Sequence, residues 1–394
     1  MKLLFLANRV PYPPYRGDKL KIYNLAQRLQ HKHELHLLTF AQTQEDLEYA
    51  EELKKIFKEV HFIYLPKWKS ALNCVRGLWD SKPLQVLYFR SAAMTRKLDE
   101  LLATHRYDAV HVQHLRMSPY LYNNKNIPRI LDLPDAFSLY WKRRKSVPRG
   151  WLVTVFEHME QRRVMRYEKI LESYDMSLVC SQEDLEYLRY EHHVSNIRLL
   201  PNGVDLQTFS ARTHDYLHNQ TLLFTGNMDY APNVDAVVYF TSEILPQIRA
   251  KHPAVKFVIA GQHPVQKVKE LASDHVVVTG FVKDLAAVYD SASVVVAPLR
   301  FGAGTQNKVL EAMAMGIPVV CSNIGFKGLG IESGEGAFME TDPALFAARV
   351  SELLDSAELR RQTGVKGIEV IRNNFDWNVV AGTLDSYFME VAAK

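Results

Sequence analysis

Residues 300–321 read Arg-Phe-Gly-Ala-Gly-Thr-Gln-Asn-Lys-Val-Leu-Glu-Ala-Met-Ala-Met-Gly-Ile-Pro-Val-Val-Cys. An apolar run from Ser293 to Leu299 precedes this loop, and a second apolar run, Ile317 to Cys321, ends the stretch. Between the two runs, a helix is predicted to begin near Thr305 and to stop at Gly316. Strand, loop, helix and strand in this order predict the right-handed parallel unit of an α/β fold.

The start of this predicted helix is a candidate anion site. Gly302 and Gly304 allow a ligand to approach the backbone, and the N–H groups of a first helical turn attract negative charge. Asn307, Lys308 and Glu311 share one face of the helix because they are three or four residues apart. Lys308 can meet a phosphate and Glu311 can accept hydrogen bonds from a ribose, which suits a sugar nucleotide. The same spacing also fits an ordinary connection that carries a surface Lys–Glu pair.

The rest of the chain alternates apolar strands with amphipathic helices, which predicts a doubly wound parallel sheet in each half. In the first half the predicted strands are 2–7, 34–39, 60–65, 109–112, 129–133 and 176–180, and the predicted helices include 19–30, 44–57 and 183–190. In the second half the predicted strands are 221–225, 256–260, 276–278, 293–297 and 319–321, and a helix is predicted near 358–372.

The length of 394 residues suits two domains rather than one core. We expect an N-terminal domain over residues 1–195, a crossing near 195–206 and a C-terminal domain over 196–377. A last helix, 378–394, is expected to return to the first domain.

The composition is that of an ordinary globular protein, at 47% hydrophobic and 23% charged residues. The net charge of +4 is too small to indicate nucleic acid as a partner. Cys74, Cys180 and Cys321 are isolated, which fits a reducing compartment. The apolar N-terminal run is too short for a signal peptide, and no run approaches the ~18 residues needed to span a bilayer. We therefore expect a cytoplasmic protein.

Three segments of the second half resemble the retaining, GT-B fold glycosyltransferases of family GT4. They are Lys-Val-Leu-Glu-Ala-Met-Ala-Met-Gly-Ile-Pro-Val-Val at 308–320, Asn-Gly-Val-Asp at 202–205, and Thr-Gly-Phe-Val-Lys-Asp at 279–284. A narrower resemblance, to sugar transferases of bacterial exopolysaccharide gene clusters, comes from residues 226–233 and from Pro-Tyr-Pro-Pro-Tyr-Arg-Gly-Asp at 11–18.

The resemblance implies two facing Rossmann-like domains with an inter-domain cleft, the second domain binding the donor and the first the acceptor. It implies transfer of a sugar from a nucleotide-diphosphate donor to a saccharide or lipid-linked saccharide, with retention and front-face attack. A UDP-sugar is favoured over a GDP-sugar, and no metal is required when protein cations stabilise the leaving group. Two alternatives remain open: a nucleotide-sugar epimerase of the same architecture, and a degenerate transferase that only binds.

The resemblance also assigns residues. The donor site would include Gly17, Gly226, Asn227, Phe281, Arg300, Gly302, Ala303, Gly304, Thr305, Gln306, Asn307, Lys308 and Glu311. The catalytic residues would be Lys308, Gln113 and His114. The His-x-His of many relatives is replaced here by His-Val-Gln-His at 111–114, so Gln113 occupies the family's histidine position and His114 lies beside it. The acceptor would contact Arg16 and Asp135. Alternatively, His111 is core packing, and residues 11–18 are a proline-rich turn with Asp18 capping the next helix.

Two departures from the family pattern concern the donor. Ala303 stands where many relatives carry a glutamate that contacts the donor sugar, so the sugar is in doubt. Asn227 and Pro232 stand where many relatives carry an arginine and a lysine for the diphosphate. Lys308, with Arg300, must then balance most of the phosphate charge.

Basic and aromatic residues gather in two stretches of the first half, which predicts contact with an anionic membrane surface. One stretch runs from Trp141 to Val153 and continues in Arg162, Arg163, Arg166 and Lys169; the other includes Lys67, Trp68, Lys69, Trp79, Tyr88 and Phe89. The same cations equally fit solvated helix faces. His31, His33 and His36 span a helix end and a strand start, which is poor metal-ligand geometry, so no metal site is predicted.

Overall fold

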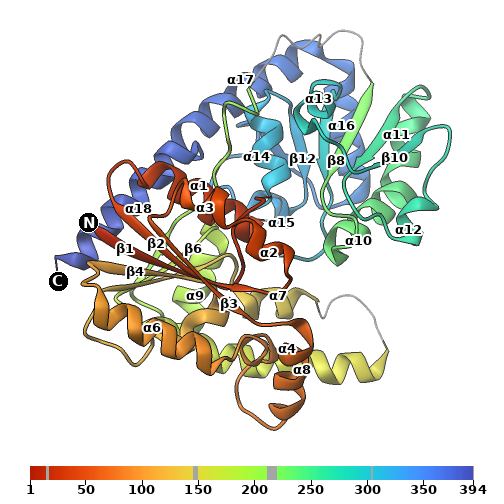
Figure 1. The fold of residues 1–394 in the computed structure, drawn as a ribbon. Helices are drawn as coiled ribbons and strands as arrows, with labels where there is room; N and C mark the ends of the chain where they lie inside the picture. Colours follow the sequence, from red (N-terminus) through yellow and green to blue (C-terminus); the bar gives the residue numbers. More distant parts are fainter. Residues whose placement is uncertain (15–16, 145–149, 211–219, 303–304, 394) are drawn as a thin grey trace. The chain divides into compact units, whose positions relative to one another are not determined.

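A computed structural model describes residues 1–14, 17–144, 150–210, 220–302 and 305–393, and these form two compact units (Figure 1). Unit 1 comprises Met1–Asn202 and Trp377–Lys394, and unit 2 comprises Gly203–Asp376. The first boundary therefore lies after residue 202 rather than after residue 195. The reason is a short strand, β7 (Ile197–Leu199), which pairs with unit 1 and which the sequence analysis assigned to the crossing.

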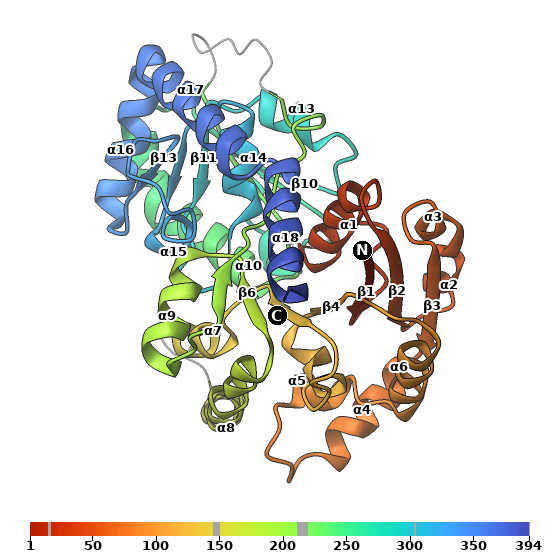
Figure 2. The same ribbon diagram turned by 90° about the vertical axis from the view of Figure 1, so that its left-hand side faces the viewer.

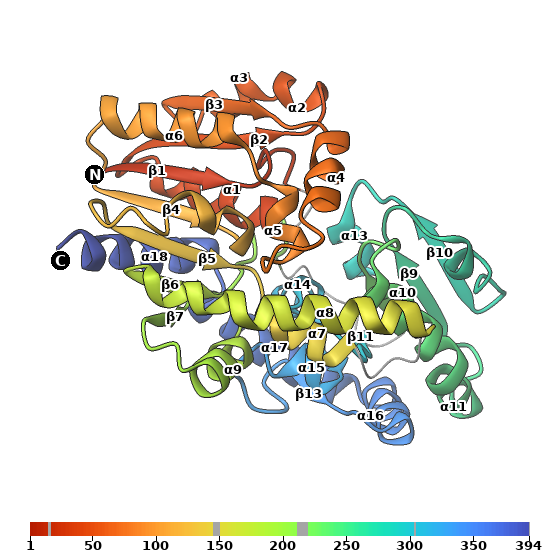
Figure 3. The ribbon, with the colours of Figure 1, turned by 90° about the horizontal axis from the view of Figure 1, so that it is seen from below.

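Unit 1 contains a parallel sheet of seven strands in the order β3-β2-β1-β4-β5-β6-β7 (Figure 3). Its strands are β1 (Lys2–Ala7), β2 (Glu34–Ala41), β3 (Glu59–Tyr64), β4 (Ala109–Gln113), β5 (Arg129–Leu133), β6 (Met176–Val179) and β7. The central strands are buried along nearly their whole length, because helices cover both faces of the sheet.

The helices of unit 1 form a layer on each face of this sheet. One layer includes α1 (Gly17–Leu29) and α18 (Trp377–Ala392), whose side chains share a core with β1 and β2. The helix predicted over 44–57 is broken at Tyr49 into α2 (Glu45–Glu48) and α3 (Ala50–Lys54). The remaining helices are α4 (Lys67–Arg76), α5 (Leu84–Tyr88), α6 (Ala92–Thr104), η1 (Leu115–Tyr120), α7 (Phe137–Arg144), α8 (Trp151–Tyr167), η2 (Glu168–Ser173) and α9 (Gln182–His192).

Unit 2 contains a parallel sheet of six strands in the order β10-β9-β8-β11-β12-β13. The strands are β8 (Thr221–Thr225), β9 (Lys256–Ala260), β10 (Val276–Gly280), β11 (Val294–Ala297), β12 (Val319–Cys321) and β13 (Ala337–Met339). The strand β13 was not predicted, because it has three residues and follows a glycine-rich segment.

The helices of unit 2 also cover both faces of their sheet, as seen for α14 and α16 on either side of β11 in Figure 2. One layer holds α10 (Ala231–Tyr239), η3 (Phe240–Ile244), α11 (Leu245–Lys251) and α16 (Pro343–Asp355). The other holds α13 (Leu285–Asp290), α14 (Asn307–Ala314) and α17 (Ala357–Asn374). Two short helices, α12 (Gln266–Lys269) and α15 (Asn323–Phe326), complete the unit. Within the described ranges, no helix has the length and apolarity to cross a membrane.

Candidate active site

Lys308 lies at the second position of α14, and its side chain points into unit 2 rather than into solvent. The residue is only 7% exposed. Its Nζ donates to Asn233 Oδ1 at 3.1 Å and to Gln306 Oε1 at 3.4 Å, and it lies 4.8 Å from the centre of the Phe224 ring. The positive charge is thus held by neutral amides and an aromatic face.

Burial lowers the pKa of Lys308 from 10.5 to about 8, and the nearby Glu311 carboxylate opposes this change only in part. Among the described residues, no carboxylate forms an ion pair with Nζ. A buried ammonium without a partner anion is unfavourable. An incoming anion would therefore gain more from this lysine than from an exposed one.

Glu311 lies one turn after Lys308 and is fixed by Tyr289. The Tyr289 hydroxyl donates to Glu311 Oε2 at 2.8 Å and lies 2.7 Å from Thr225 Oγ1, deep in unit 2. Burial raises the pKa of Glu311, whereas the Tyr289 hydrogen bond and the Lys308 charge lower it. The carboxylate is held on the same helix face as Lys308.

Asn233, which the sequence analysis did not assign to the site, links Lys308 to the loop after β8. Its Oδ1 accepts from Lys308, and its Nδ2 donates to the Asn227 carbonyl oxygen at 3.0 Å. Gly226 has φ +153°, and a Cβ there would lie 2.6 Å from Asn233 Nδ2, so this position requires glycine. The clue in the sequence was an amide in the first turn of the helix that follows the glycine.

Asn227 and Arg300 both have partners within unit 2. Asn227 Oδ1 accepts from Gln262 Nε2 at 2.8 Å. Arg300 forms a bidentate pair with Asp235 at 2.8 and 2.5 Å and stacks on the Tyr239 ring at 4.8 Å. The Arg300 charge is matched by Asp235 on α10, which leaves Lys308 as the less compensated of the two cations.

The remaining donor candidates lie around the same helix start, except for Phe281 and for Gly17, which is the first residue of α1 in unit 1. Gly302 has φ +143°, Thr305 is buried, and Gln306 and Asn307 are the N-cap and first residue of α14. Phe281 follows β10 and is largely exposed. Ala303 and Gly304 lie outside the described residues, so their predicted contacts have no structural account.

In unit 1, Gln113 is the last residue of β4 and His114 follows it, and both are buried. The Gln113 Nε2 donates to the Asp18 carbonyl oxygen. His114 has φ +78°, its ring packs on Phe137 at 4.8 Å, and its Nδ1 accepts from the Arg116 N–H at 3.3 Å. Burial, followed by the charges of nearby arginines, holds the pKa of His114 well below its usual range. This imidazole is therefore neutral at pH 7.

His111 is a core residue, in agreement with the packing alternative. Its Nε2 lies 3.2 Å from Asp132 Oδ2, and Lys21 Nζ donates to Asp132 Oδ1 at 2.7 Å and to the Leu200 carbonyl oxygen at 2.9 Å. All three side chains are buried. This group joins α1, β4 and β5, so it fixes the loops that carry Gln113 and His114.

The two acceptor candidates are Asp135 and Arg16, and the structure describes only Asp135. Asp135 lies after β5 beside Asp184 and Cys180, and burial, with the Asp184 charge as the second cause, raises its pKa well above the ordinary value. Arg16 lies outside the described residues. Asp18 was predicted to cap α1, and this prediction is wrong. The helix already begins at Gly17, which places Asp18 in its first turn.

Many side chains of the predicted basic-aromatic stretches are exposed on α4, the segment after it and α8, and this set of exposed side chains is here called the α4–α8 surface. Its most exposed aromatic side chains are Trp68 at 63%, Trp79 at 97% and Trp151 at 74%. Its exposed aliphatic residues and cations are Leu72, Val75, Leu78, Val155, Met159, Lys67, Lys69, Arg76, Arg162 and Arg166. The Arg163 guanidinium donates to the Leu78 carbonyl oxygen, which joins α8 to the segment after α4.

Several residues expected on this surface lie elsewhere. Phe89 is buried in the core, where it contacts Phe40. Arg143 pairs with Glu183, and Arg144 pairs with Glu157 at 2.6 Å, so these two cations are matched inside the unit. Residues 145–149 lie outside the described ranges.

Comparison with known families gives two matches that together span most of the chain. Residues 22–208 match the model described as Glycosyltransferase Family 4, and residues 219–356 match the model described as Glycosyl transferases group 1. The matches fall one on each half of the chain.

Two curated relatives illustrate the range of similar proteins. An uncharacterized 44.6 kDa protein in the cps region of Klebsiella pneumoniae is 24% identical, over 95% of this chain and 96% of its own length. Phosphatidyl-myo-inositol mannosyltransferase of Mycobacterium tuberculosis is 28% identical, over 77% of this chain and 79% of its own length.

Solved structures share the fold at low identity. Sucrose-phosphate synthase from Thermosynechococcus elongatus has a TM-score of 0.74 at 17% identity, with 100% of both chains covered. The Anabaena protein HepE, solved in complex with UDP-glucose, has a TM-score of 0.70 at 14% identity, with 99% of this chain and 100% of that chain covered.

Proposed function

This chain belongs to the family 4 glycosyltransferases, and from that premise we propose that it transfers a hexose from a nucleotide-diphosphate donor, with retention, to a saccharide or lipid-linked saccharide. The observation that carries the proposal is the Lys308 ammonium, buried among Asn233, Gln306 and Phe224. Its lowered pKa marks a cation that gains a partner when the donor diphosphate binds.

In the proposed reaction the bond between the anomeric carbon and the diphosphate oxygen breaks, and an acceptor oxygen forms a new bond on the same face. The departing diphosphate takes the acceptor proton. Lys308 stabilises the negative charge that develops on the diphosphate, which is how preorganised cations lower such barriers. This chemistry asks for no protein carboxylate at the anomeric carbon and no metal ion.

Glu311 is proposed to bind the ribose of the nucleotide. Tyr289 occupies Oε2 from inside the unit, so the other oxygen can accept a hydroxyl hydrogen bond. We favour UDP over GDP, and two observations support the choice. The structurally similar HepE was solved with UDP-glucose, and the sequence resembles a family in which UDP-sugars are common donors.

The acceptor is proposed to be presented at an anionic membrane surface in a pathway for exopolysaccharide or another cell-surface glycan. The similar protein of the cps region and the similar phosphatidyl-myo-inositol mannosyltransferase support this choice. On the chain itself, the α4–α8 surface contains exposed tryptophans together with exposed lysines and arginines. Each of these cations near an anionic leaflet would contribute roughly 1 kcal/mol, and the tryptophans would insert at the interface.

A donor-turnover assay tests the transferase proposal. The purified protein is incubated with UDP-glucose, UDP-galactose, UDP-N-acetylglucosamine and GDP-mannose, and release of the nucleotide is measured with and without a membrane extract as acceptor source. Release that Lys308→Met abolishes and Lys327→Met leaves intact supports the proposal, because Lys327 is an exposed lysine of the same unit. Binding without turnover of any donor would favour the degenerate transferase, and conversion of the donor sugar to its epimer would favour the epimerase.

Vesicle co-sedimentation tests the membrane proposal separately. The parent protein should sediment with vesicles containing phosphatidylglycerol at low salt, and the double variant Trp68→Ser/Trp79→Ser should remain in the supernatant. Tyr190→Ser is the matched control, since Tyr190 is a similarly exposed aromatic residue on α9. Equal sedimentation of all three proteins, or none by the parent, would contradict the proposal.

A further inference from the structure

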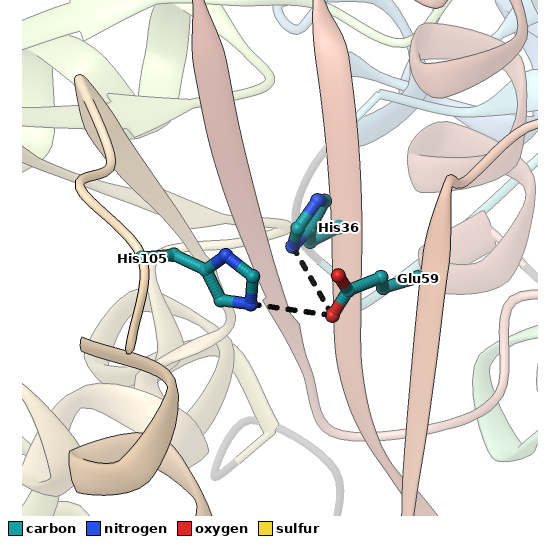
Figure 4. A group of neighbouring side chains, drawn as sticks. All are labelled: His36, Glu59 and His105. Carbon is teal, nitrogen blue, oxygen red and sulfur yellow. Dashed lines mark ion pairs between the residues drawn. The ribbon is translucent and has the colours of Figure 1, made fainter. Parts of the chain in front are cut away.

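Unit 1 carries a second cluster of chemical groups, away from the loops that hold Gln113 and His114. It consists of His36 near the start of β2, Glu59 at the start of β3 and His105 just after α6. These positions lie at the amino ends of parallel strands, whereas the acceptor candidates lie at the carboxyl ends. Figure 4 shows both imidazole rings directed toward the Glu59 carboxylate.

The distances in this cluster suit ligands around an ion better than hydrogen-bond partners. His36 Nδ1 lies 3.7 Å and His105 Nε2 lies 3.4 Å from Glu59 Oε2, and one ligand atom from each residue lies within 4.8 Å of the others. Tetrahedral ligands about 2.0–2.2 Å from a zinc ion are separated from one another by about 3.3–3.5 Å. The separations from Glu59 Oε2 are therefore close to those of a bound ion.

Hydrogen bonds to Glu59 alone do not explain the arrangement. His61 Nε2 already lies 3.0 Å from Glu59 Oε2, so this one oxygen has three imidazoles around it. Only the His61 contact has ordinary hydrogen-bond length. The two longer contacts, from His36 and His105, leave room for a cation between the rings and the carboxylate.

The surroundings hold the three side chains in place. His36 is fully buried, its ring packs against His105 at 4.9 Å, and its Nε2 lies 3.2 Å from Glu34 Oε1. Glu34 is in turn paired with Lys2 at 2.9 Å and Lys58 at 2.8 Å. A carboxylate on the far nitrogen of a histidine is the usual support of a metal ligand, because it fixes the tautomer and the ring orientation.

We propose that His36, Glu59 and His105 bind one divalent transition-metal ion of the Zn²⁺ class, with water or Tyr107 completing the coordination. The Tyr107 hydroxyl lies 2.9 Å from His36 Nδ1, so its hydrogen must leave that lone pair when the ion binds. The ion would tie β2, β3 and the segment ahead of β4 together. The site would be structural. It lies at the amino ends of the strands, whereas the acceptor candidates lie at the carboxyl ends, and the proposed sugar transfer needs no metal.

In the sequence, His36 lies near His31 and His33, a group with poor metal-ligand geometry, so no metal site was predicted there. The partners of His36 are instead Glu59 and His105, which are distant in the chain. They meet only when β2 pairs with β3 and when β1 pairs with both β2 and β4.

The test is calorimetric titration of Zn²⁺ into tag-free protein freed of metal by chelation. We expect one ion per chain, bound at least tenfold more weakly by His105→Ala and by Glu59→Gln. His275→Ala, which removes an imidazole from unit 2, should bind as the parent does. A thermal melt without metal shows that each variant is folded, and added Zn²⁺ should raise the melting temperature of the parent and of His275→Ala only.

Titration with Co²⁺ gives an independent readout, because a tetrahedral site of nitrogen and oxygen ligands produces visible absorption that Glu59→Gln should abolish. The proposal is overturned if the parent binds no Zn²⁺, or if folded His105→Ala and Glu59→Gln bind it as tightly as the parent. The second result would place the ion elsewhere, for example at Asp135, Cys180 and Asp184.

Discussion

Among the residues that the structure describes, each unit buries one lysine beside the carboxyl ends of its strands, and the two lysines have opposite kinds of partner. In unit 1, Lys21 has a carboxylate at 2.7 Å, from Asp132, and a backbone carbonyl oxygen at 2.9 Å. In unit 2, Lys308 has two amide oxygens and an aromatic ring, and burial lowers its pKa to about 8. The charge of Lys21 is balanced by a carboxylate, whereas Lys308 forms no ion pair with any carboxylate in the part of the chain that the structure describes.

This difference separates a structural cation from a proposed ligand-binding one without reference to any relative. A buried pair such as Lys21 and Asp132 is costly to break but offers a ligand little, since both charges are already compensated. A buried ammonium held only by dipoles retains most of its attraction for a phosphate. Substitutions of the two lysines should therefore have opposite effects on the free energy of unfolding, and only that of Lys308 should directly reduce activity.

Lys21→Met should cause the largest loss of stability. It leaves the Asp132 carboxylate buried with only the 3.2 Å contact to His111. We expect a loss of about 3–5 kcal/mol in the free energy of unfolding, measured by urea denaturation. Lys327→Met, at an exposed position, should change it by less than about 0.5 kcal/mol. A loss no larger than that of the control would show that the Lys21–Asp132 pair is not structural.

Lys308→Met should cause the largest loss of activity. Removing a charge-assisted contact to the leaving diphosphate costs on the order of 3 kcal/mol, or about a hundredfold in rate. Steady-state turnover of the preferred donor measures this effect. Unchanged turnover by folded Lys308→Met would remove this residue from the mechanism.

The same Lys308→Met variant should be more stable than the parent in the absence of donor. Since a tenfold change in proton affinity corresponds to about 1.4 kcal/mol, a pKa moved from 10.5 to about 8 corresponds to at most roughly 3 kcal/mol. The lost hydrogen bond to Asn233 offsets part of this gain.

The pH dependence has a definite sign. Below pH 8 Lys308 is protonated in both the folded and the unfolded state, so the folded parent bears the full free-energy cost of burying the ammonium. The gain in unfolding free energy from methionine is therefore greatest below pH 8. Between pH 8 and 10.5 the unfolded state binds more protons, so the parent gains stability as the pH rises and the advantage disappears. Melting curves at pH 7 and 10 measure this, and an advantage that grows with pH would contradict it.

Tyr289→Phe should give the smallest effect. It removes the hydroxyl that donates to Glu311 at 2.8 Å while preserving the buried ring. Glu311 should lose its fixed orientation, and nucleotide affinity should fall by about three- to tenfold, or roughly 1 kcal/mol. Calorimetry measures the affinity, and Glu311→Gln should weaken it at least as much. Tighter binding by Tyr289→Phe would argue against this role of Tyr289.

The sequence predicted the two parallel sheets well because long apolar runs bounded by loops have few other solutions. The strands β1, β5, β8, β9 and β12 have the predicted bounds. Both unpredicted strands, β7 and β13, have three residues, too few for a periodic pattern. The break at Tyr49 was also missed, because an amphipathic pattern continues across it.

The sequence predicted only some residues of the candidate site, for a different reason. Lys308 and Glu311 are neighbours on one helix, so their spacing shows that they share a face. Asn233 and Tyr289 reach them from other elements, and the partners of Arg300 and His114 likewise depend on tertiary packing. Whether a lysine is paired or lacks a carboxylate partner is decided by such contacts, which single-sequence patterns do not contain.

The most direct test of the proposed role of Lys308 is calorimetric binding of nucleotides and their nucleosides. UDP and uridine, and GDP and guanosine, are titrated into the parent, Lys308→Met and Lys327→Met. For the preferred base, the parent and Lys327→Met should bind the diphosphate at least about a hundredfold more tightly than the nucleoside. Lys308→Met should lose most of that difference while retaining its nucleoside affinity. An undiminished preference for the diphosphate in Lys308→Met would contradict the assignment of Lys308 as the phosphate-binding cation.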